Sequence, residues 1–266
     1  MRMTNPHVSL TLLIAMAMSL ASFGADWEQE LTPLKPGEFA PLRPVEAHYR
    51  FGWEKFVAAD AQFKVVALTN QLLEVQGTAQ SDGFVRTLWR FDLQHTSWRD
   101  AGFRPQGFTQ TEIYKRKTVK TRVGFGQSGL IRNNEITPLA ESSETKTYPV
   151  ANACDPFSAY LLMRSQPLRV GDRYRLLVYP GLHLYLAELN VIGAETIKVE
   201  QVPRVAIKLS LGLQQVTDQM SLVPYGKFKR ATVWLSDDQE RIPLKAEADI
   251  FVGAVWAELH RAEYSK

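Results

Sequence analysis

The stretch ATVWLSDDQERIPLKAEADI, residues 231–250, decides how the chain is interpreted, because it sets three acidic side chains between two runs of alternating polarity. Val233 and Leu235 alternate with other residues before the acids, and from Ile242 to Ile250 every second side chain is apolar. A period of two is that of a β-strand with one buried face. The stretch therefore predicts two strands joined by DDQER, a turn of common hairpin length.

The acids of this turn, Asp237, Asp238 and Glu240, are expected to face water, since polar side chains at a turn satisfy nearby backbone groups and stay hydrated. An acid/base pair needs one carboxyl with a raised pKa, which requires burial or a close like charge. A cation site would need more oxygen ligands than these three residues provide. A carboxylate hydrolase acting on envelope glycans through these acids is therefore kept only as the alternative function.

The same period of two extends outward from this hairpin. Tyr49, Phe51 and Trp53 share one face of a predicted strand, and 61–65 follows as the next strand after a turn near 57–59. At Gly253 the apolar positions change register, which predicts a bulge or bend inside the last strand. Further strands are predicted at 71–77, 107–123, 173–179, 183–192, 196–202, 205–213, 231–236 and 241–259.

Two short helices interrupt the strands. In DPFSAYLLMR, residues 155–164, Asp155 is suited to the N-cap and Pro156 to the first helical position. The stretch 84–91 has apolar residues at helical spacing, although its composition leaves a strand open. Many strands, one or two short helices and no βαβ alternation predict a mainly β fold, a curved antiparallel sheet or an open barrel-like fold.

The N-terminus has the features of a secretory signal. Arg2 precedes an uncharged apolar run at 8–20, and Ser22 and Gly24 supply the small residues of a cleavage site. We expect a signal peptide at 1–24 with the cut after Gly24, a Pro-rich extension at 25–46, and a single β-rich domain at 47–266. An uncleaved membrane anchor is the alternative. The predicted location is the periplasm, with no membrane span in the mature chain.

Composition and motifs point to no catalytic residue, cofactor or metal. The net charge of +3 is too small to indicate nucleic acid as a partner, and Cys154, the single cysteine, is expected to be a buried hydrophobe. The four histidines beyond residue 24 lack the paired spacing of a metal motif. GFGQSG, residues 124–129, matches a dinucleotide pattern but leads into no helix, so a glycine-rich hairpin turn is predicted there.

A basic segment, YKRKTVKTR at 114–122, offers a possible interaction surface. Two interpretations stay open: a solvated edge strand protected by lysine, or a surface that binds anionic groups. The candidate residues of such an anionic surface are Lys115, Arg116, Lys117, Lys120 and Arg122.

Tryptophans in the predicted strands leave a second choice open. Trp234 and Trp256 occupy the strand face opposite their aliphatic neighbours, so both faces of the sheet carry apolar bulk there. Either a helix covers the second face, or that face lines a cavity for an apolar ligand. The residues proposed for such a cavity are Trp53, Trp234, Trp256, Phe157 and Tyr160.

The C-terminal half is similar to a known family. The motifs are a D-x-x-S-A-type helix at 155–159 with an R-x-x-P-L-x-V-G exit at 164–171, an E-x-I strand at 195–197, the W-L-S-x-D-x-x-R-x-P hairpin at 234–243, and a glycine with A-E-L at 253–259. These resemble family 3108 of the bacterial domains of unknown function. The resemblance implies an envelope protein, mainly β, with no established activity, and an analogy with periplasmic lipoprotein carriers.

Together, the export signal, the two-sided apolar strands and the missing catalytic spacing favour a non-enzymatic periplasmic protein. We expect it to bind a lipid-like ligand or an envelope partner on a curved sheet with the helix 155–164 against the concave side.

Overall fold

The computed structural model describes residues 26–39, 42–67, 72–100, 102–137, 144–228 and 230–265. The predicted signal peptide and its cut after Gly24 lie outside these residues. A 3-10 helix at Asp26–Glu30 comes first, and the two α-helices are α1 (Gly83–Leu88) and α2 (Pro156–Ser165). The strands are β1 (Val45–Trp53), β2 (Phe56–Ala67), β3 (Leu72–Ser81), β4 (Phe91–Asp100), β5 (Pro105–Tyr114), β6 (Lys117–Gly126), β7 (Gly129–Thr137), β8 (Glu144–Tyr148), β9 (Ala153–Cys154), β10 (Arg173–Val178), β11 (Leu184–Val199), β12 (Val202–Val216), β13 (Leu222–Pro224), β14 (Arg230–Ser236), β15 (Pro243–Ile250) and β16 (Gly253–Tyr264).

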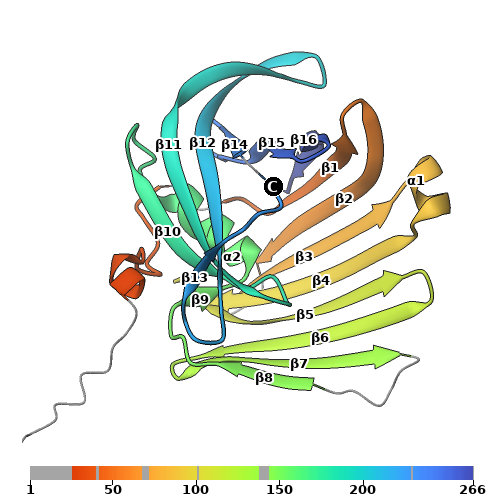
Figure 1. Cartoon of the computed structure of the whole chain (residues 1–266). Helices are drawn as coiled ribbons and strands as arrows, with labels where there is room; N and C mark the ends of the chain where they lie inside the picture. The colour runs from red at the N-terminus through yellow and green to blue at the C-terminus, as the bar shows by residue number, and fades with distance from the viewer. Residues whose placement is uncertain are drawn as a thin grey trace, which may run out of the picture.

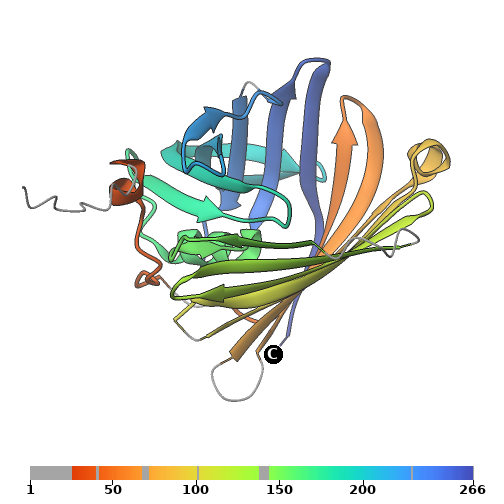
Figure 2. The ribbon, with the colours of Figure 1, turned by 60° about the horizontal axis from the view of Figure 1, so that its bottom comes forward.

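All of these strands belong to one sheet, with the order β8-β7-β6-β5-β4-β3-β2-β1-β16-β15-β14-β12-β11-β10-β9 and β13 beside β12. Neighbours pair antiparallel except β9 and β10. The sheet is strongly curved, with one concave face and one convex face (Figures 1 and 2). Its terminal strands β8 and β9 do not pair with each other. The prediction of a mainly β, open barrel-like fold is therefore confirmed.

Several predicted strand limits were wrong. The stretch 107–123 is a hairpin, because the chain reverses at Lys115, which has a positive φ of 50°. The stretch 241–259 is also a hairpin: β15 and β16 join through Phe251 and Val252, and Gly253, with φ 104°, opens the returning strand. The register change at Gly253 thus marks a chain reversal and not a bulge. Conversely, 184–192 and 196–199 belong to the single long strand β11, and Val202 already begins β12.

Helix α2 forms where the sequence predicts it. The Asp155 carboxylate accepts hydrogen bonds from the backbone N–H groups of Phe157 and Ser158, which satisfies two of the free donors of the first turn. The helix lies inside the curve of the sheet (Figure 1). The other predicted helix, 84–91, is shorter: α1 ends at Leu88, and Phe91 already belongs to β4.

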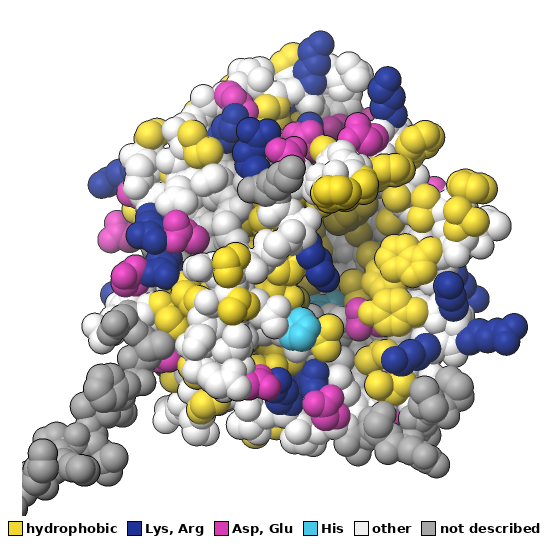
Figure 3. All heavy atoms as spheres, viewed as in Figure 1, with side chains coloured by type: hydrophobic (Ala, Val, Ile, Leu, Met, Phe, Trp, Pro, Cys, Tyr) yellow, Lys and Arg dark blue, Asp and Glu magenta, His cyan; other side chains and the backbone are white. Residues whose placement is uncertain are grey.

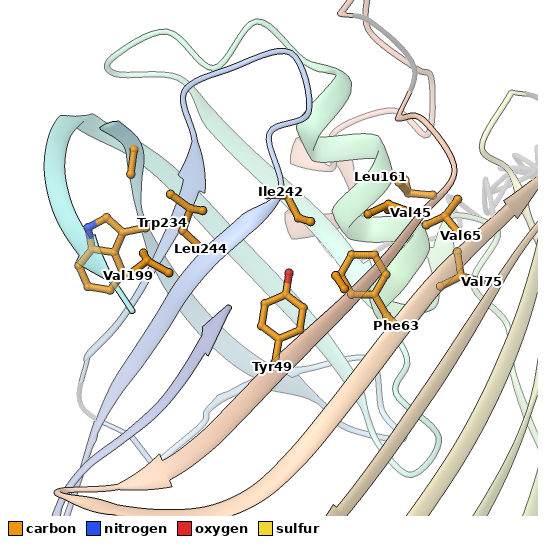
Figure 4. Packing of buried hydrophobic residues seen from close by; sticks show 12 residues of the cluster. Val45, Tyr49, Phe63, Val65, Val75, Leu161, Val199, Trp234, Ile242 and Leu244 are labelled. Carbon is orange, nitrogen blue, oxygen red and sulfur yellow. The ribbon is translucent and has the colours of Figure 1, made fainter. Parts of the chain in front are cut away.

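Buried side chains from opposite parts of the sheet meet around α2. Leu161 packs in a cluster with residues of β1, β2 and β3, among them Tyr49 and Phe63 (Figure 4). Met163 packs in a second cluster with β10, β11, β12 and β14. A helix that fills one side of the curve in this way leaves the remaining concave surface to be lined by the strands alone.

Candidate functional site

The concave surface beyond α2 is hollowed, and Figure 3 shows the hollow lined largely by hydrophobic side chains. The lining follows from strand alternation: Tyr49 packs toward α2, so Phe51 and Trp53, two and four positions on, point to the same inner face. The pairing of β1 with β2 and of β2 with β3 places Ala61 and Ala79 in register with Tyr49. We call this surface the inner hollow.

Small side chains line the middle of the inner hollow. Residues that are register partners on neighbouring strands form rows across the sheet. The first row consists of Leu259, Tyr49, Ala61, Ala79 and Leu93, and the second of Ala246, Ala257, Phe51 and Ala59. The alanines of both rows are partly exposed. In a small barrel, inward-facing side chains fill the interior, whereas wider ones leave a ligand cavity. Alanine at these positions leaves that space unfilled.

Aromatic side chains stand at the open end of the inner hollow. Trp53 is 43% exposed and stacks on Phe56. On the other side, the rings of Trp89 and Phe91 stack with centroids 5.5 Å apart, and Tyr114 follows at 5.3 Å from Phe91. The Tyr114 hydroxyl donates to Glu112 Oε1 at 2.7 Å, and burial together with this carboxylate raises the pKa of Tyr114. The open end is thus apolar with one anchored polar pair.

The floor of the inner hollow is where α2 meets β3 and β4. Phe157 lies over Gly77, where an added Cβ would approach its ring Cζ to 2.9 Å. Next to them His95 is buried, with its ring 5.2 Å from that of Phe157 and its Nδ1 3.0 Å from Gln110 Oε1. The Nε2 atom of His95 has no hydrogen-bond partner among the described residues. A buried imidazole with one hydrogen-bond partner therefore closes the hollow.

This histidine predicts a pH dependence of stability. Burial lowers the pKa of His95, although Gln110 and Asp155 act in the opposite direction. Above about pH 6.5 both folded and unfolded chains are neutral at this site; below it the unfolded chain takes up a proton first, so the free energy of unfolding falls as the pH falls. Urea unfolding at about pH 7.5 and about pH 5.5 should show His95→Gln losing less stability than the wild type, by up to about 1.4 kcal/mol per pH unit. Equal losses in both proteins would contradict the assignment.

The family model described as Protein of unknown function (DUF3108) matches residues 46–260. The chain belongs to this family. No curated protein sequence matches it.

Solved structures show similar folds. A beta-barrel-like protein of DUF1849 from Brucella abortus has a TM-score of 0.58 and 10% identity, covering 85% of this chain and 100% of that one. A candidate exported protein with a YmcC-like fold from Bacteroides fragilis (TM-score 0.33, 9% identity, 86% and 99% coverage) and a DUF1089 family protein from Pseudomonas aeruginosa (0.35, 9%, 72% and 90%) are more distant. At 10% identity the likeness to the Brucella protein shows the fold alone.

The five residues that the sequence predicted for one cavity lie in different places in this DUF3108 domain. Trp53 lies at the open end of the inner hollow, and Phe157 and Tyr160 lie on α2 below it, where Tyr160 donates to the carbonyl of Arg241. Trp234 alternates with residues that pack toward α2, and Figure 4 shows its ring at the end of the cluster far from the helix. Trp256 alternates with Val255 and Ala257 and lies against Gly52.

The acids of the DDQER turn are only partly hydrated. Asp237 and Asp238 are exposed, as predicted, but Glu240 is buried and pairs with Arg43 at 2.5 Å. The Asp238 Oδ1 atom accepts from Ser236 Oγ and from two backbone N–H groups of its own turn. The expectation that all three face water was therefore wrong for Glu240, because this turn packs onto α2 instead of projecting as a free tip.

The basic segment of the DUF3108 domain lies on the hairpin of β5 and β6. Lys115 and Arg116 form its turn, Lys117 begins β6, and Lys120 and Arg122 follow on the face away from the inner hollow. All five side chains are exposed. The segment is a hairpin end and not the continuous strand predicted from the sequence.

Two further features bear on chemistry. Cys154 is buried, which raises the pKa of its thiol and keeps it protonated. Within the described ranges no group of three or more His, Cys, Asp or Glu side chains is arranged to hold a metal ion. The hollow residues that the sequence analysis missed, such as Ala61 and Ala79, carry only the period-two signal common to every inward position.

Proposed function

We propose that the inner hollow binds a lipid-like ligand without catalysing a reaction. The observation that carries this proposal is the pair of alanine-rich rows, which leave a large concave apolar surface unfilled. Ligand sites are typically apolar concavities with a few placed polar groups. Here the polar groups are Tyr114 with Glu112 near the open end and His95 with Gln110 at the floor.

The carboxylate hydrolase finds little support. Its three acids lie in a turn beside α2, and Asp238 and Glu240 already have structural partners. Outside the hollow, a depression of about 470 Å³ lies on the outer face of β2, β3 and β4, lined by polar residues that include Gln62, Thr78 and Gln94. Its lining also includes the charged Asp60 and Asp92, which do not suit a lipid tail.

Filling the inner hollow tests the proposal. Ala61 and Ala79 face each other across β2 and β3, so Ala61→Trp with Ala79→Trp places two large rings in the middle of the hollow. We expect the variant to bind an apolar fluorescent dye about tenfold more weakly than the wild type, or worse, because the rings occupy the ligand volume. Native mass spectrometry after gentle extraction should also show less co-purified lipid.

The matched control uses the next register pair on the same strands. Gln62 and Thr78 lie on the outer face, so Gln62→Trp with Thr78→Trp adds the same bulk outside the hollow and fills the polar depression instead. This control should bind dye as the wild type does. If it loses the dye while the inner variant keeps it, or if the wild type takes up neither dye nor lipid, the proposed function fails.

We further propose that the protein is exported to the periplasm with cleavage after Gly24, leaving a Pro-rich extension at 25–46 ahead of a single β-rich domain at 47–266. The apolar run at 8–20 and the small residues before the cut support this. No helix among the described residues has the length and apolar character needed to cross a bilayer. Mass measurement of the protein from a periplasmic extract should give a chain beginning at Ala25.

A further inference from the structure

Four successive connections of the sheet lie along one edge, at the open end of the inner hollow. They are the turns β15–β16, β1–β2 and β5–β6 and the connection through α1, and both ribbon views place them on the same side of the molecule (Figures 1 and 2). Hydrogen bonds join each to the next: Trp53 Nε1 to the carbonyl of Val252, the Asp82 N–H to that of Ala58, and the Lys115 N–H to that of Arg90. We call these connections the rim.

The rim gathers exposed hydrophobic side chains. Phe84 is 76% exposed and Phe251 is 91% exposed, although both are large and apolar. More than half of the exposed large hydrophobic residues in the described ranges lie on the rim or on the strand ends beside it: Phe51, Trp53, Phe56, Val57, Phe84, Leu88, Trp89, Phe251 and Val252. Single exposed hydrophobics are normal, but many of them gathered along one edge are typical of an interaction site.

The charges beside these side chains are mainly positive. Lys55 lies in the β1–β2 turn, and Lys115, Arg116 and Lys117 lie in and beside the β5–β6 turn; none of them forms an ion pair with a described residue. Arg86 and Arg90 of the α1 connection share Asp92. The acids here include Glu54 of the β1–β2 turn, which accepts a backbone hydrogen bond from Ala254, and Asp82, which precedes α1. Free positive charge therefore accompanies apolar side chains along the rim.

The chemistry of the rim fits the surface of an anionic membrane. Aromatic and aliphatic side chains on short turns can enter the boundary between head groups and acyl chains, where tryptophan is favoured, while lysine and arginine contact anionic head groups. These basic and apolar side chains are spread over several short turns along one edge, which matches the extended surface of an anionic bilayer. We propose that the rim docks on an anionic lipid bilayer and turns the open end of the inner hollow toward the lipid.

Vesicle binding tests this proposal on the mature chain. Wild-type protein should co-sediment with vesicles of phosphatidylcholine mixed with phosphatidylglycerol and bind pure phosphatidylcholine vesicles more weakly. The double variant Phe84→Ser with Phe251→Ser should lose about tenfold or more in vesicle affinity. The triple variant Lys115→Gln, Arg116→Gln, Lys117→Gln should lose about 100-fold on the anionic vesicles and little on the neutral ones.

Controls separate docking from general stickiness and from folding. Ile131→Ser and Val205→Ser remove exposed hydrophobics that lie away from the rim, and should bind vesicles as the wild type does. Lipid brominated in its acyl chains should quench the fluorescence of Trp53 and Trp89, an effect that Trp89→Phe reduces. All these positions are exposed, so unchanged melting temperatures are expected.

Three outcomes would overturn the proposal: no sedimentation of the wild type with anionic vesicles, equal sedimentation of the Phe84→Ser, Phe251→Ser variant, or an equal loss in the two off-rim controls. The first of these would favour a protein partner for the rim. The docking proposal does not depend on a ligand in the inner hollow. We therefore expect the Ala61→Trp, Ala79→Trp variant still to bind vesicles. Failure of one proposal is thereby distinguishable from failure of the other.

Discussion

Replacing Arg241 with alanine is expected to lower the free energy of unfolding by about 3 kcal/mol or more. The Arg241 guanidinium is buried and donates to three carbonyl oxygens at the end of α2, those of Arg164, Gln166 and Pro167. It also lies 3.4 Å from the centre of the Phe39 ring. The variant leaves these carbonyls without their donor and removes a cation–π contact, and both losses occur away from water.

The measurement is urea-induced unfolding followed by circular dichroism. Arg122→Ala, which removes an exposed arginine on β6, is the matched control and should change stability by less than about 0.5 kcal/mol. Arg241→Lys keeps the charge but lacks the planar fork that reaches several carbonyls, so it should fall between the wild type and the alanine variant. A stability of Arg241→Ala equal to that of Arg122→Ala would show that the DDQER turn does not hold α2.

Replacing Asp155 with alanine is expected to be similarly damaging, by about 3 to 5 kcal/mol. The Asp155 carboxylate is fully buried and caps α2 at its first turn, and the Ser158 hydroxyl donates to it as well. It is also the negative charge that favours the charged form of Arg99, whose pKa burial lowers. Without Asp155 a fully buried guanidinium keeps only its hydrogen bond to Ser97, since its Nε and Nη1 atoms have no other partner among the described residues.

Two further variants separate the contribution of the helix cap from that of the buried charge and provide a control. Asp155→Asn keeps an oxygen that can cap the helix and removes only the charge, so the stability difference between the asparagine and alanine variants reports the cap. Asp237→Ala, an exposed acid, should leave the unfolding midpoint in urea unchanged. If the asparagine variant is as stable as the wild type, the charge near Arg99 contributes nothing.

The sequence predicted correctly those elements that are determined by residues close together in the chain. Asp155 followed by Pro156 fixes the start of α2 through backbone geometry and capping, and the alternation at Tyr49, Phe51 and Trp53 identifies the inner face of β1 correctly. The mainly β, open barrel-like fold followed from many such short alternating runs.

The β5–β6 and β15–β16 turns of the rim escaped prediction, and the β1–β2 turn was predicted near 57–59 although it lies at Glu54 and Lys55. Phe251 and Val252 are not turn-forming types, so the reversal between β15 and β16 resembled a continuous strand. The start of β4 was obscured in the same way, since Phe84, Leu88 and Phe91 also fit a helical spacing.

The candidate site was predicted only in part, since it depends on which strands become neighbours. Ala61 and Ala79 are unremarkable until β2 and β3 pair and bring them side by side. Inward polar residues such as His95 and Arg99 break the apolar alternation of β4, so no strand was predicted there. The position of the DDQER turn against α2 likewise depends on a contact across the fold that no local pattern encodes.

The unpaired ends of the sheet affect how wide the molecule can be. In a closed barrel, the number of strands and their stagger fix the circumference, and any change of girth must break a ladder of hydrogen bonds. Here β8, Glu144–Tyr148, and β9, Ala153–Cys154, end the sheet without pairing, although Tyr148 and Ala153 pack in one buried cluster. Side-chain packing, and not a ladder of hydrogen bonds, therefore joins the two ends of the sheet, so a change of girth would disturb this buried cluster and break no backbone hydrogen bond between β8 and β9.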